Sequence, residues 1–307
     1  MADYVKLKNE RDDDSPKRKK RKSWFSWKMF FLFFFLFFFL SSIISSFIYS
    51  VTPKAGIVPI NGVILTDKET TLYGTSLSSR DIADTILALD EDTSVKAIIL
   101  DINSPGGSPV ASEEISRAIE RAEKPVYAII SETGASGAFW IAMSADKVYA
   151  SEMSIVGSIG VTSAGLAFEE FIDEYNITYR RLVAGEHKDM GTPFRELTGK
   201  EEEKLQNILD EIHENFIVHV AEARNLSRED VEEYATGEIF LGSTGKEAGF
   251  IDEFGYMKDL LEDIEAEHGS LLVENYAPET TLGDLLLGLS SIGGLDLFSA
   301  QNQILLK

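Results

Sequence analysis

The sequence contains no cysteine among its 307 residues, and this absence excludes several kinds of chemistry. A chain without thiols has no disulfide bonds, no thiolate metal site and no cysteine nucleophile. The cellular compartment stays open, because an exported protein can fold without disulfides. Histidine is scarce as well, with 4 residues in the whole chain, so a histidine base has few candidates.

Positive charge is scarce after residue 54. Residues 55–307 hold 18 Lys and Arg against 46 Asp and Glu, which is a net charge of −28. Nucleic-acid binding requires a basic patch, so we expect no nucleic-acid partner. An acidic surface of this kind also helps a protein to stay soluble at high salt. Residues 1–54 have the opposite balance, with a net charge of +6.

The first 54 residues join a basic cluster to a long uncharged apolar run. The cluster KRKKRK covers Lys17–Lys22, and the 21 residues of Met29–Tyr49 form a helix of about 31 Å if fully helical, which matches a bilayer core. The basic end of a membrane helix stays in the cytoplasm. We therefore expect a cytoplasmic tail over residues 1–28, a single transmembrane anchor over residues 29–50 in the cell membrane, and an extracytoplasmic remainder.

Two other interpretations compete with a retained anchor. A cleaved signal peptide also begins with basic residues and an apolar core, but this apolar run is long and no small-residue cleavage site follows it cleanly. The basic cluster alone also fits a nuclear or nucleic-acid patch. Beside such a helix, however, a role in setting the membrane topology explains the cluster better.

Apolar runs alternate with amphipathic stretches along residues 54–275, which we expect to form the extracytoplasmic domain. Val95–Asp101 and Pro125–Ile130 are typical of buried parallel strands, and a helical pattern follows each of them. This alternation predicts an α/β fold in which helices cover the faces of a parallel sheet.

Several other stretches predict individual elements. Gly56–Leu65, with Asn61-Gly62 as its turn signal, predicts a structure like a β-hairpin. Ile177–Val183 predicts a strand, and a capping box opens a long helical pattern over Thr198–Arg224. The tail over residues 276–307 is apolar and rich in Gly and Ser, which indicates an interfacial segment or a subunit contact.

A turn of small residues joins the strand pattern that ends at Ile130 to an apolar helical pattern. Gly134–Ala138 reads GASGA, so Ser136 lies on a sharp strand-to-helix turn. The helix N-terminus supplies backbone N–H groups and a partial positive charge there, which is how a fold exposes a nucleophilic oxygen. The alternative is an ordinary tight turn that needs small residues for backbone reasons.

A second glycine site, Ser104-Pro105-Gly106-Gly107, follows the preceding predicted strand. Ligands bind at the carboxyl ends of parallel strands. The N–H groups of Gly106 and Gly107, together with that of Gly137, could form an oxyanion hole for acyl transfer. The alternative is a simple turn. A P-loop is excluded, because no Gly-Lys-Ser/Thr follows.

A serine nucleophile needs a base, and the residue types leave two candidates open. His187 and Lys188 are neighbours in one loop, and adjacent loop residues point in different directions. A Ser136–His187–Asp189 triad is one solution, and a buried Lys188 is chemically competent as well. The remaining histidines fit surface or packing roles better: His213, His219 and His268.

Four ordered motifs resemble the signal peptide peptidase A (SppA) family of membrane-bound serine proteases, in the Clp protease/crotonase-like superfamily. The resemblance runs from about Ile57 to Phe254. The motifs are DINSPGGSPVASEEI, ETGASGAFWIAMSADKVYA, IVGSIGV and GEHKDMGTPFRELT. The resemblance implies a Clp protease/crotonase-like parallel sheet with a C-terminal helical extension, and it implies a Ser–Lys dyad in place of a triad.

The resemblance also implies a role for each matching residue. Ser136 matches the nucleophile, Lys188 the base, and Ser158 the serine whose hydroxyl orients the lysine amine. The glycines of the oxyanion hole match Gly106, Gly107 and Gly137. The family commonly has Gly-Gly-Tyr after the nucleophile, where this chain has Gly-Ala-Phe, a difference expected to affect the shape of the pocket more than the dyad.

The function implied by this resemblance is a membrane-anchored serine endopeptidase that needs no cofactor or metal. Its expected substrates are remnant signal peptides or other membrane-associated peptides, and it is expected to form a homo-oligomer at the bilayer. A different anchored Ser–Lys protease with one specific membrane partner is a rival. A catalytically inactive crotonase-like scaffold that binds a membrane partner is the alternative from another class.

Overall fold

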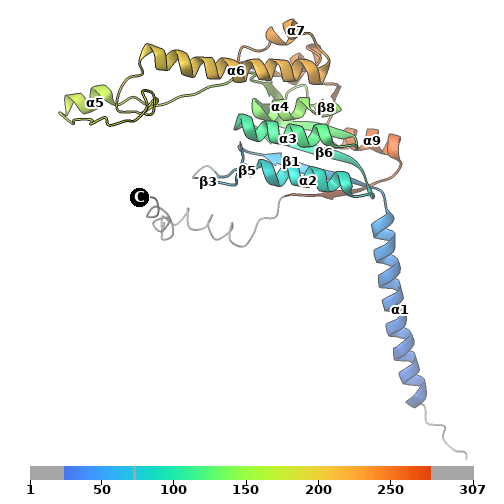
Figure 1. Ribbon diagram of the computed structural model, residues 1–307. Coiled ribbons are helices and arrows are strands. Elements are labelled where there is room, and N and C mark those ends of the chain that lie inside the picture. Colours follow the sequence, from blue (N-terminus) through green and yellow to red (C-terminus); the bar gives the residue numbers. More distant parts are fainter. Residues whose placement is uncertain (1–23, 72–73, 278–307) are drawn as a thin grey trace, which may run out of the picture. The chain divides into compact units, whose positions relative to one another are not determined.

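The computed structural model describes residues 24–71 and 74–277 (Figure 1). The chain divides into two compact units between Val51 and Thr52, and each unit is considered by itself. The described part of the first unit is the helix α1, Trp24–Val51. Its window Trp27–Ile44 is long and apolar enough to cross a membrane, by length and composition.

The second unit is built around a largely parallel sheet. Its strands run in the order β10-β9-β7-β6-β1-β12, with β8 beside β7 and β11 beside β8. Only the pairing of β10 with β9 is antiparallel among the described strands of this sheet. The bounds are β1 Lys54–Asn61, β6 Val95–Ser104, β7 Val126–Ala135, β8 Lys147–Ala150, β9 Ile155–Gly157, β10 Ile239–Leu241, β11 Glu253–Phe254 and β12 Leu272–Asn275.

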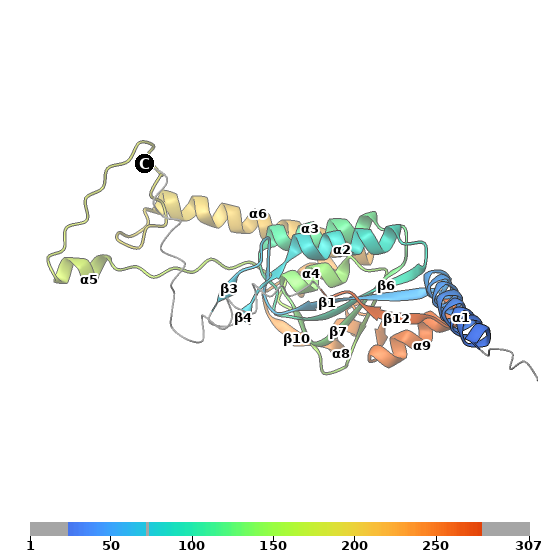
Figure 2. The ribbon, with the colours of Figure 1, turned by 90° about the horizontal axis from the view of Figure 1, so that it is seen from below.

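Helices cover both faces of this sheet, because its central strands are apolar on both sides (Figures 1 and 2). Along β6, Ile98 and Leu100 belong to one buried cluster, whereas Ala97 and Ile99 belong to another. This period of two is the expected consequence of a pleated strand. The first cluster packs under α2 Ser79–Glu91, α3 Pro109–Arg121, α4 Gly137–Met143 and α6 Gly199–Arg224, and the second under α9 Met257–His268. The predicted α/β fold with a largely parallel sheet is confirmed.

The predicted hairpin over Gly56–Leu65 is wrong. The strand β1 pairs in parallel with β6 and β12, while Ile64–Leu65 forms a separate short strand, β2, that pairs with β5, Leu77–Ser78. The reason is burial: nearly every residue of β1 is buried or half-buried, as in a central strand that is covered on both faces. Two further short strands pair with each other, β3 Thr70–Thr71 and β4 Gly74–Thr75.

Residues 161–198, which we call the arm, extend beyond the edge of the sheet (Figures 1 and 2). Their described structure is one short helix, α5, Glu169–Glu174, with irregular chain on either side. The predicted strand over Ile177–Val183 is therefore wrong. Its residues are exposed, and no neighbouring strand pairs with them, so its β-branched and aromatic residues have no sheet to join.

The helix α6 leads from the arm back to the core. Thr198 and Glu201 form the predicted capping box at its start. In its C-terminal half, Phe216, Ile217 and Val220 are buried against the first cluster, whereas Ile208 in the N-terminal half is 51% exposed. The remaining helices are α7 Arg228–Glu232 and α8 Gly242–Glu247. Nearly all of the apolar tail predicted over residues 276–307 lies outside the described residues.

Candidate active site

Ser136 stands at the turn between β7 and α4 in a strained backbone conformation. Its φ is 53° and its ψ is −126°, a region that L-residues rarely adopt. Two backbone hydrogen bonds hold it there: its N–H donates to the Gly157 carbonyl at 2.8 Å, and its carbonyl accepts from the Trp140 N–H at 3.0 Å. The side chain is half-buried and caps no helix N–H group. The predicted strand–turn–helix setting of Ser136 is present.

Three glycines pack closely around this turn. A Cβ atom on Gly107 would lie 1.9 Å from the Ile64 carbonyl oxygen, and one on Gly137 would lie 2.2 Å from Ser112 Oγ. Gly106 has φ +98°, and its Cβ would lie 2.7 Å from the Gly137 backbone nitrogen. No larger residue fits at these three positions without a shift of the backbone or of a buried side chain. The structure therefore brings the two glycine motifs together, although about 30 residues separate them.

The backbone N–H groups of these glycines have different partners. The N–H of Gly106 donates to Ser104 Oγ at 3.0 Å, and this fully buried hydroxyl donates to the Gly62 carbonyl at 2.6 Å. The N–H of Gly107 has no partner among the described residues. Gly137 is the first residue of α4, so its N–H is one of the free donors of a helix start. The geometry thus offers Gly107 and Gly137 as oxyanion donors and leaves Gly106 a packing role.

Ser158 lies beside Ser136 through the pairing of β9 with β7. The parallel register places Gly157 opposite Ala135, so the next residue on each strand is a serine. Ser158 also has a positive φ, 55°, and its N–H donates to the Glu238 carbonyl at 2.8 Å. Ser158 and Ser136 thus follow directly after paired residues of two neighbouring strands.

Lys188 lies on the arm, and the structure does not bring it to Ser136. In both views the arm is at the far end of α6 from α4, whose first turn follows Ser136 (Figures 1 and 2). The Lys188 side chain is exposed, and among the described residues it makes no hydrogen bond or ion pair. A lysine base works in its neutral form, which exposure to water disfavours. In a single copy of the chain, the proposed dyad is therefore incomplete.

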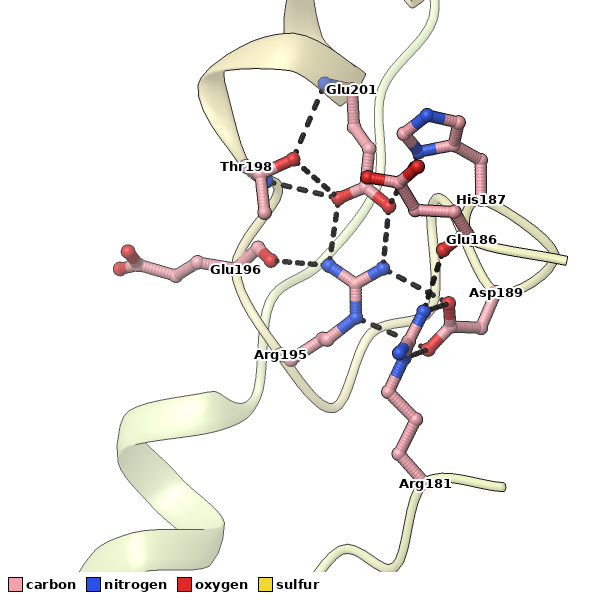
Figure 3. A network of polar contacts seen from close by, with 8 residues as sticks. All are labelled: Arg181, Glu186, His187, Asp189, Arg195, Glu196, Thr198 and Glu201. Atoms are coloured by element: carbon pink, nitrogen blue, oxygen red, sulfur yellow. Dashed lines mark hydrogen bonds and ion pairs between the residues drawn. The ribbon is translucent and has the colours of Figure 1, made fainter. Parts of the chain in front are cut away.

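The two neighbours of Lys188 belong to a network of polar contacts (Figure 3). Asp189 accepts hydrogen bonds from Arg181 and Arg195, and these bonds hold the pKa of its carboxyl well below the ordinary value. The His187 Nδ1 atom is 3.6 Å from a carboxylate oxygen of Glu201. Asp189 thus binds arginines instead of His187, and both residues lie on the arm. The alternative Ser136–His187–Asp189 triad is not formed.

No sequence pattern indicates that Arg181, Arg195 and Glu201 form a network with the neighbours of Lys188. Arg181 and Arg195 lie in irregular chain and Glu201 lies in the first turn of α6, so no single helix or strand period relates these three residues to Lys188. Glu201 was recognised only as part of a capping box. Its carboxylate both caps α6 and binds Arg195, which no local pattern indicates. Among the described residues, no group of three His, Asp or Glu is arranged to hold a metal ion.

Residues 118–270 match the family described as peptidase family S49. A protein of Methanocaldococcus jannaschii that is named as a protease is 38% identical over 179 residues, or 58% of this chain and 58% of that protein. A protein of Enterococcus faecium that is named as a signal peptide peptidase SppA is 31% identical over 212 residues, or 68% of this chain and 62% of that protein.

Protease 4 of Haemophilus influenzae is 30% identical over 223 residues, which cover 71% of this chain and 35% of that protein. The match thus spans about three fifths of the length of the first two relatives and about a third of the last. Among solved structures, a membrane-bound stomatin-specific protease in complex with a substrate peptide is similar with a TM-score of 0.47 and 16% identity, over 78% of this chain and 99% of that chain.

Proposed function

Because the chain carries a peptidase family S49 domain, we propose that it is a membrane-anchored serine endopeptidase with Ser136 as nucleophile and Lys188 as base. One observation carries the proposal: Ser136 stands on a strained turn beside the N–H groups of Gly107 and Gly137, which have no acceptor among the described residues. The Gly137 N–H is buried, the Gly107 N–H is exposed, and a Cβ atom on Gly137 would lie 3.3 Å from the Gly107 nitrogen. Two neighbouring donors of this kind beside a serine hydroxyl support a site built for a developing oxyanion.

The reaction follows from these groups. The neutral amine of Lys188 takes the proton of Ser136 as Oγ attacks the scissile carbonyl, and the carbonyl oxygen becomes an oxyanion that accepts from the N–H groups of Gly107 and Gly137. The tetrahedral intermediate collapses, and the leaving amine receives its proton from Lys188. Water, deprotonated by Lys188, then releases the acyl group from Ser136. The Ser158 hydroxyl accepts from the Lys188 amine and orients it.

Lys188 has to reach Ser136, and we propose that a second copy of the chain supplies it. Lys188 is exposed on the arm, and several large apolar side chains of the arm are exposed as well, such as Leu182 at 95% exposure. The N-terminal half of α6 has an uncovered apolar residue as well, Ile208. Docking this surface on a neighbour would bury it and would place Lys188 in the dry surroundings that a neutral amine needs. The expected homo-oligomer then has a catalytic reason.

The substrates we propose are remnant signal peptides or other membrane-associated peptides. The apolar helix α1 supports an anchor, and the basic cluster before it supports a cytoplasmic N-terminus. The domain at residues 54–275 then works at the outer face of the membrane. Cleavage of a peptide library distinguishes a general scavenger, which cuts many apolar sequences, from a protease with one specific membrane partner.

Turnover of a fluorogenic peptide by the full chain in detergent tests the dyad. Ser136→Ala and Lys188→Ala should each abolish turnover, whereas His187→Ala should retain it, because His187 lies beside Glu201 and not beside the nucleophile. Mixing the two inactive variants before assembly should restore about a quarter of the wild-type rate, since a quarter of the sites then pair an intact serine with an intact lysine from a neighbour.

Each result has a separate meaning. An active Lys188→Ala variant contradicts the dyad. Active single copies, or a mixture that stays inactive while both variants assemble, contradict the shared site and leave a dyad that closes within one chain. A wild-type chain that cleaves no peptide and still binds a membrane partner supports the inactive scaffold.

A further inference from the structure

The loop that carries Lys188 is closed by local turns. The backbone N–H of Lys188 donates to the Gly185 carbonyl at 3.2 Å, and the N–H of Met190 donates to the His187 carbonyl at 3.2 Å. Gly185 and Gly191 flank the loop with φ values of +103° and +85°, which other residues adopt only with strain. These turns shape the loop, but they do not attach it to the rest of the chain.

Asp189 provides the attachment. Arg181 donates to both of its carboxylate oxygens, at 2.6 and 2.8 Å, and Arg195 donates to the same two oxygens at 3.2 and 3.1 Å. Only 11% of the Asp189 side chain is exposed. Two guanidinium groups thus hold one carboxylate, and this carboxylate directly follows Lys188 in the chain. Bidentate pairs of this kind fix orientation as well as distance.

Arg195 connects this carboxylate to α6. Its two terminal nitrogens donate to the two oxygens of Glu201 at 2.8 and 2.7 Å. The Glu201 side chain is 3% exposed, and it also accepts from the N–H and the hydroxyl of Thr198, the N-cap of α6. The guanidinium of Arg195 therefore bridges two carboxylates, a half-buried one beside Lys188 and a buried one in the first turn of a 26-residue helix (Figure 3).

Apolar packing does not hold this part of the chain in place. Ile172 is buried, but most large apolar side chains of the arm are exposed, including Leu166, Phe171, Ile177 and Leu182. A loop on such a surface keeps one position only if directional contacts fix it. The contacts that qualify are those between Asp189, Arg195 and Glu201, because they are bidentate and nearly closed to water.

From this arrangement we infer that Arg195 is a positioning residue for the reaction: by bridging Asp189 to Glu201 it presents Lys188 rigidly from the end of α6. The inference rests on the proposed function, in which Lys188 is the base. The Arg195 guanidinium donates to Asp189, Glu201 and the Glu196 carbonyl, so we expect its removal to slow proton transfer and to leave peptide binding intact. Misplacement of a catalytic group by about 1 Å costs up to about 100-fold in rate.

The test measures kcat and KM of the full chain in detergent on a fluorogenic peptide. Arg195→Ala should lower kcat by about 10- to 100-fold with KM unchanged. Arg195→Lys should recover only part of this loss, because one ammonium group cannot bridge two carboxylates bidentately. Added guanidinium ion, well below denaturing concentrations, should restore turnover to Arg195→Ala and should not restore it to Lys188→Ala.

Arg228 provides the matched control. It also contacts two carboxylates, Glu214 and Glu232, but on a solvent-exposed surface away from the arm. Arg228→Ala should therefore keep the wild-type kcat. If Arg195→Ala fails to fold, the isosteric Asp189→Asn removes the charge that the two arginines hold, and it should lower kcat in the same way.

Different results contradict the positioning role of Arg195 and the Ser136–Lys188 dyad. Full kcat in Arg195→Ala or in Asp189→Asn, with an inactive Lys188→Ala, overturns the positioning role and leaves the dyad intact. A loss expressed in KM alone overturns it as well, because a group that only positions the base does not change peptide binding. An active Lys188→Ala variant overturns the proposed function itself.

Discussion

Two serines of the candidate site share a backbone feature that serine rarely shows. Among the described residues that are not glycine, four have a positive φ: Ser136, Ser158, Asn176 and Asn225. Asparagine adopts this region readily, as Asn225 does at the end of α6. Serine does so only where the surroundings enforce it, and both serines lie at the same place in the sheet. Strain that is concentrated in this way supports a catalytic role for the pair.

At the residue scale, Ser104 offers a test of the oxyanion geometry. Ser104→Ala leaves the buried Gly106 N–H without an acceptor, which should cost about 1–3 kcal/mol of unfolding free energy. The peptide that presents the Gly107 N–H should also loosen, and kcat should fall about 10- to 100-fold. Ser108→Ala is the control, since the Ser108 hydroxyl makes no cap hydrogen bond in the same loop. Equal kcat and stability in the two variants would contradict this account.

At the scale of elements, an aromatic stack contributes to the contact between α4 and α6. The His219 ring lies on the Trp140 ring with 4.3 Å between centroids and 5° between planes. Trp140 is the fourth residue of α4, and its carbonyl and the Ser144 hydroxyl lie 3.2 Å from His219 Nε2. The helix that begins at Ser136 is thus held by the packed half of α6. This contact connects the nucleophile turn to the helix that carries the arm.

This stack predicts a pH dependence of stability. Burial lowers the pKa of His219, and the Trp140 carbonyl and the nearby carboxylates of Glu120, Glu222 and Glu113 oppose this only partly. The folded pKa lies below the unfolded value of about 6.5, so between the two the unfolded chain binds more protons. The contribution of His219 to the free energy of unfolding should therefore be fully present above about pH 6.5, and it should be lost as the pH drops below this value.

Thermal unfolding of the full chain between pH 8 and pH 5 provides the measurement. His219→Gln should flatten the loss of unfolding temperature toward acidic pH, whereas His268→Gln, at the end of α9, should not. If the unfolding temperatures of the wild type and of His219→Gln fall in parallel toward acidic pH, groups other than His219 determine the pH dependence of stability.

The sequence predicts some elements correctly and others wrongly. The difference is whether the pattern that predicts an element depends only on neighbouring residues. The capping box of α6 and the apolar run of β6 consist of residues that are neighbours in the chain, so the sequence alone identifies them. The strand predicted over Ile177–Val183 has strand propensity but no partner, and propensity alone does not form a sheet. The Asn61-Gly62 turn signal is present with φ +85° at Gly62, but the chain after it does not return to β1.

At the scale of the whole molecule, the first residues of the second unit already belong to its sheet. Lys54 is the first residue of β1: its N–H donates to the Ser94 carbonyl, its ammonium lies 3.3 Å from Glu274, and the Pro53 carbonyl accepts from the Leu272 N–H. The edge strand β12 thus depends on residues that directly follow the apolar helix.

Truncation tests this dependence. A chain that begins at Thr52 should stay in solution without detergent and unfold cooperatively, because it removes α1 and keeps all of these contacts. A chain that begins at Gly56 should unfold at a lower temperature, since it loses two residues of β1 and the Glu274 ion pair. Circular dichroism melts of the two compare them directly, and equal midpoints would show that the first residues of β1 contribute nothing.

The sequence by itself determined four features: a serine on a strand-to-helix turn, a glycine pair after the neighbouring strand, an apolar helix, and a strongly acidic composition after residue 54. These features depend on residues that are adjacent in the chain, so local backbone preferences and composition express them. Only the tertiary structure decided that the Gly106 N–H is taken by Ser104 and that Lys188 is held on an arm away from Ser136. Hydrogen-bond partners and the placement of an exposed segment arise from contacts between residues far apart in sequence, such as Ser104 with Gly62, which no local pattern contains.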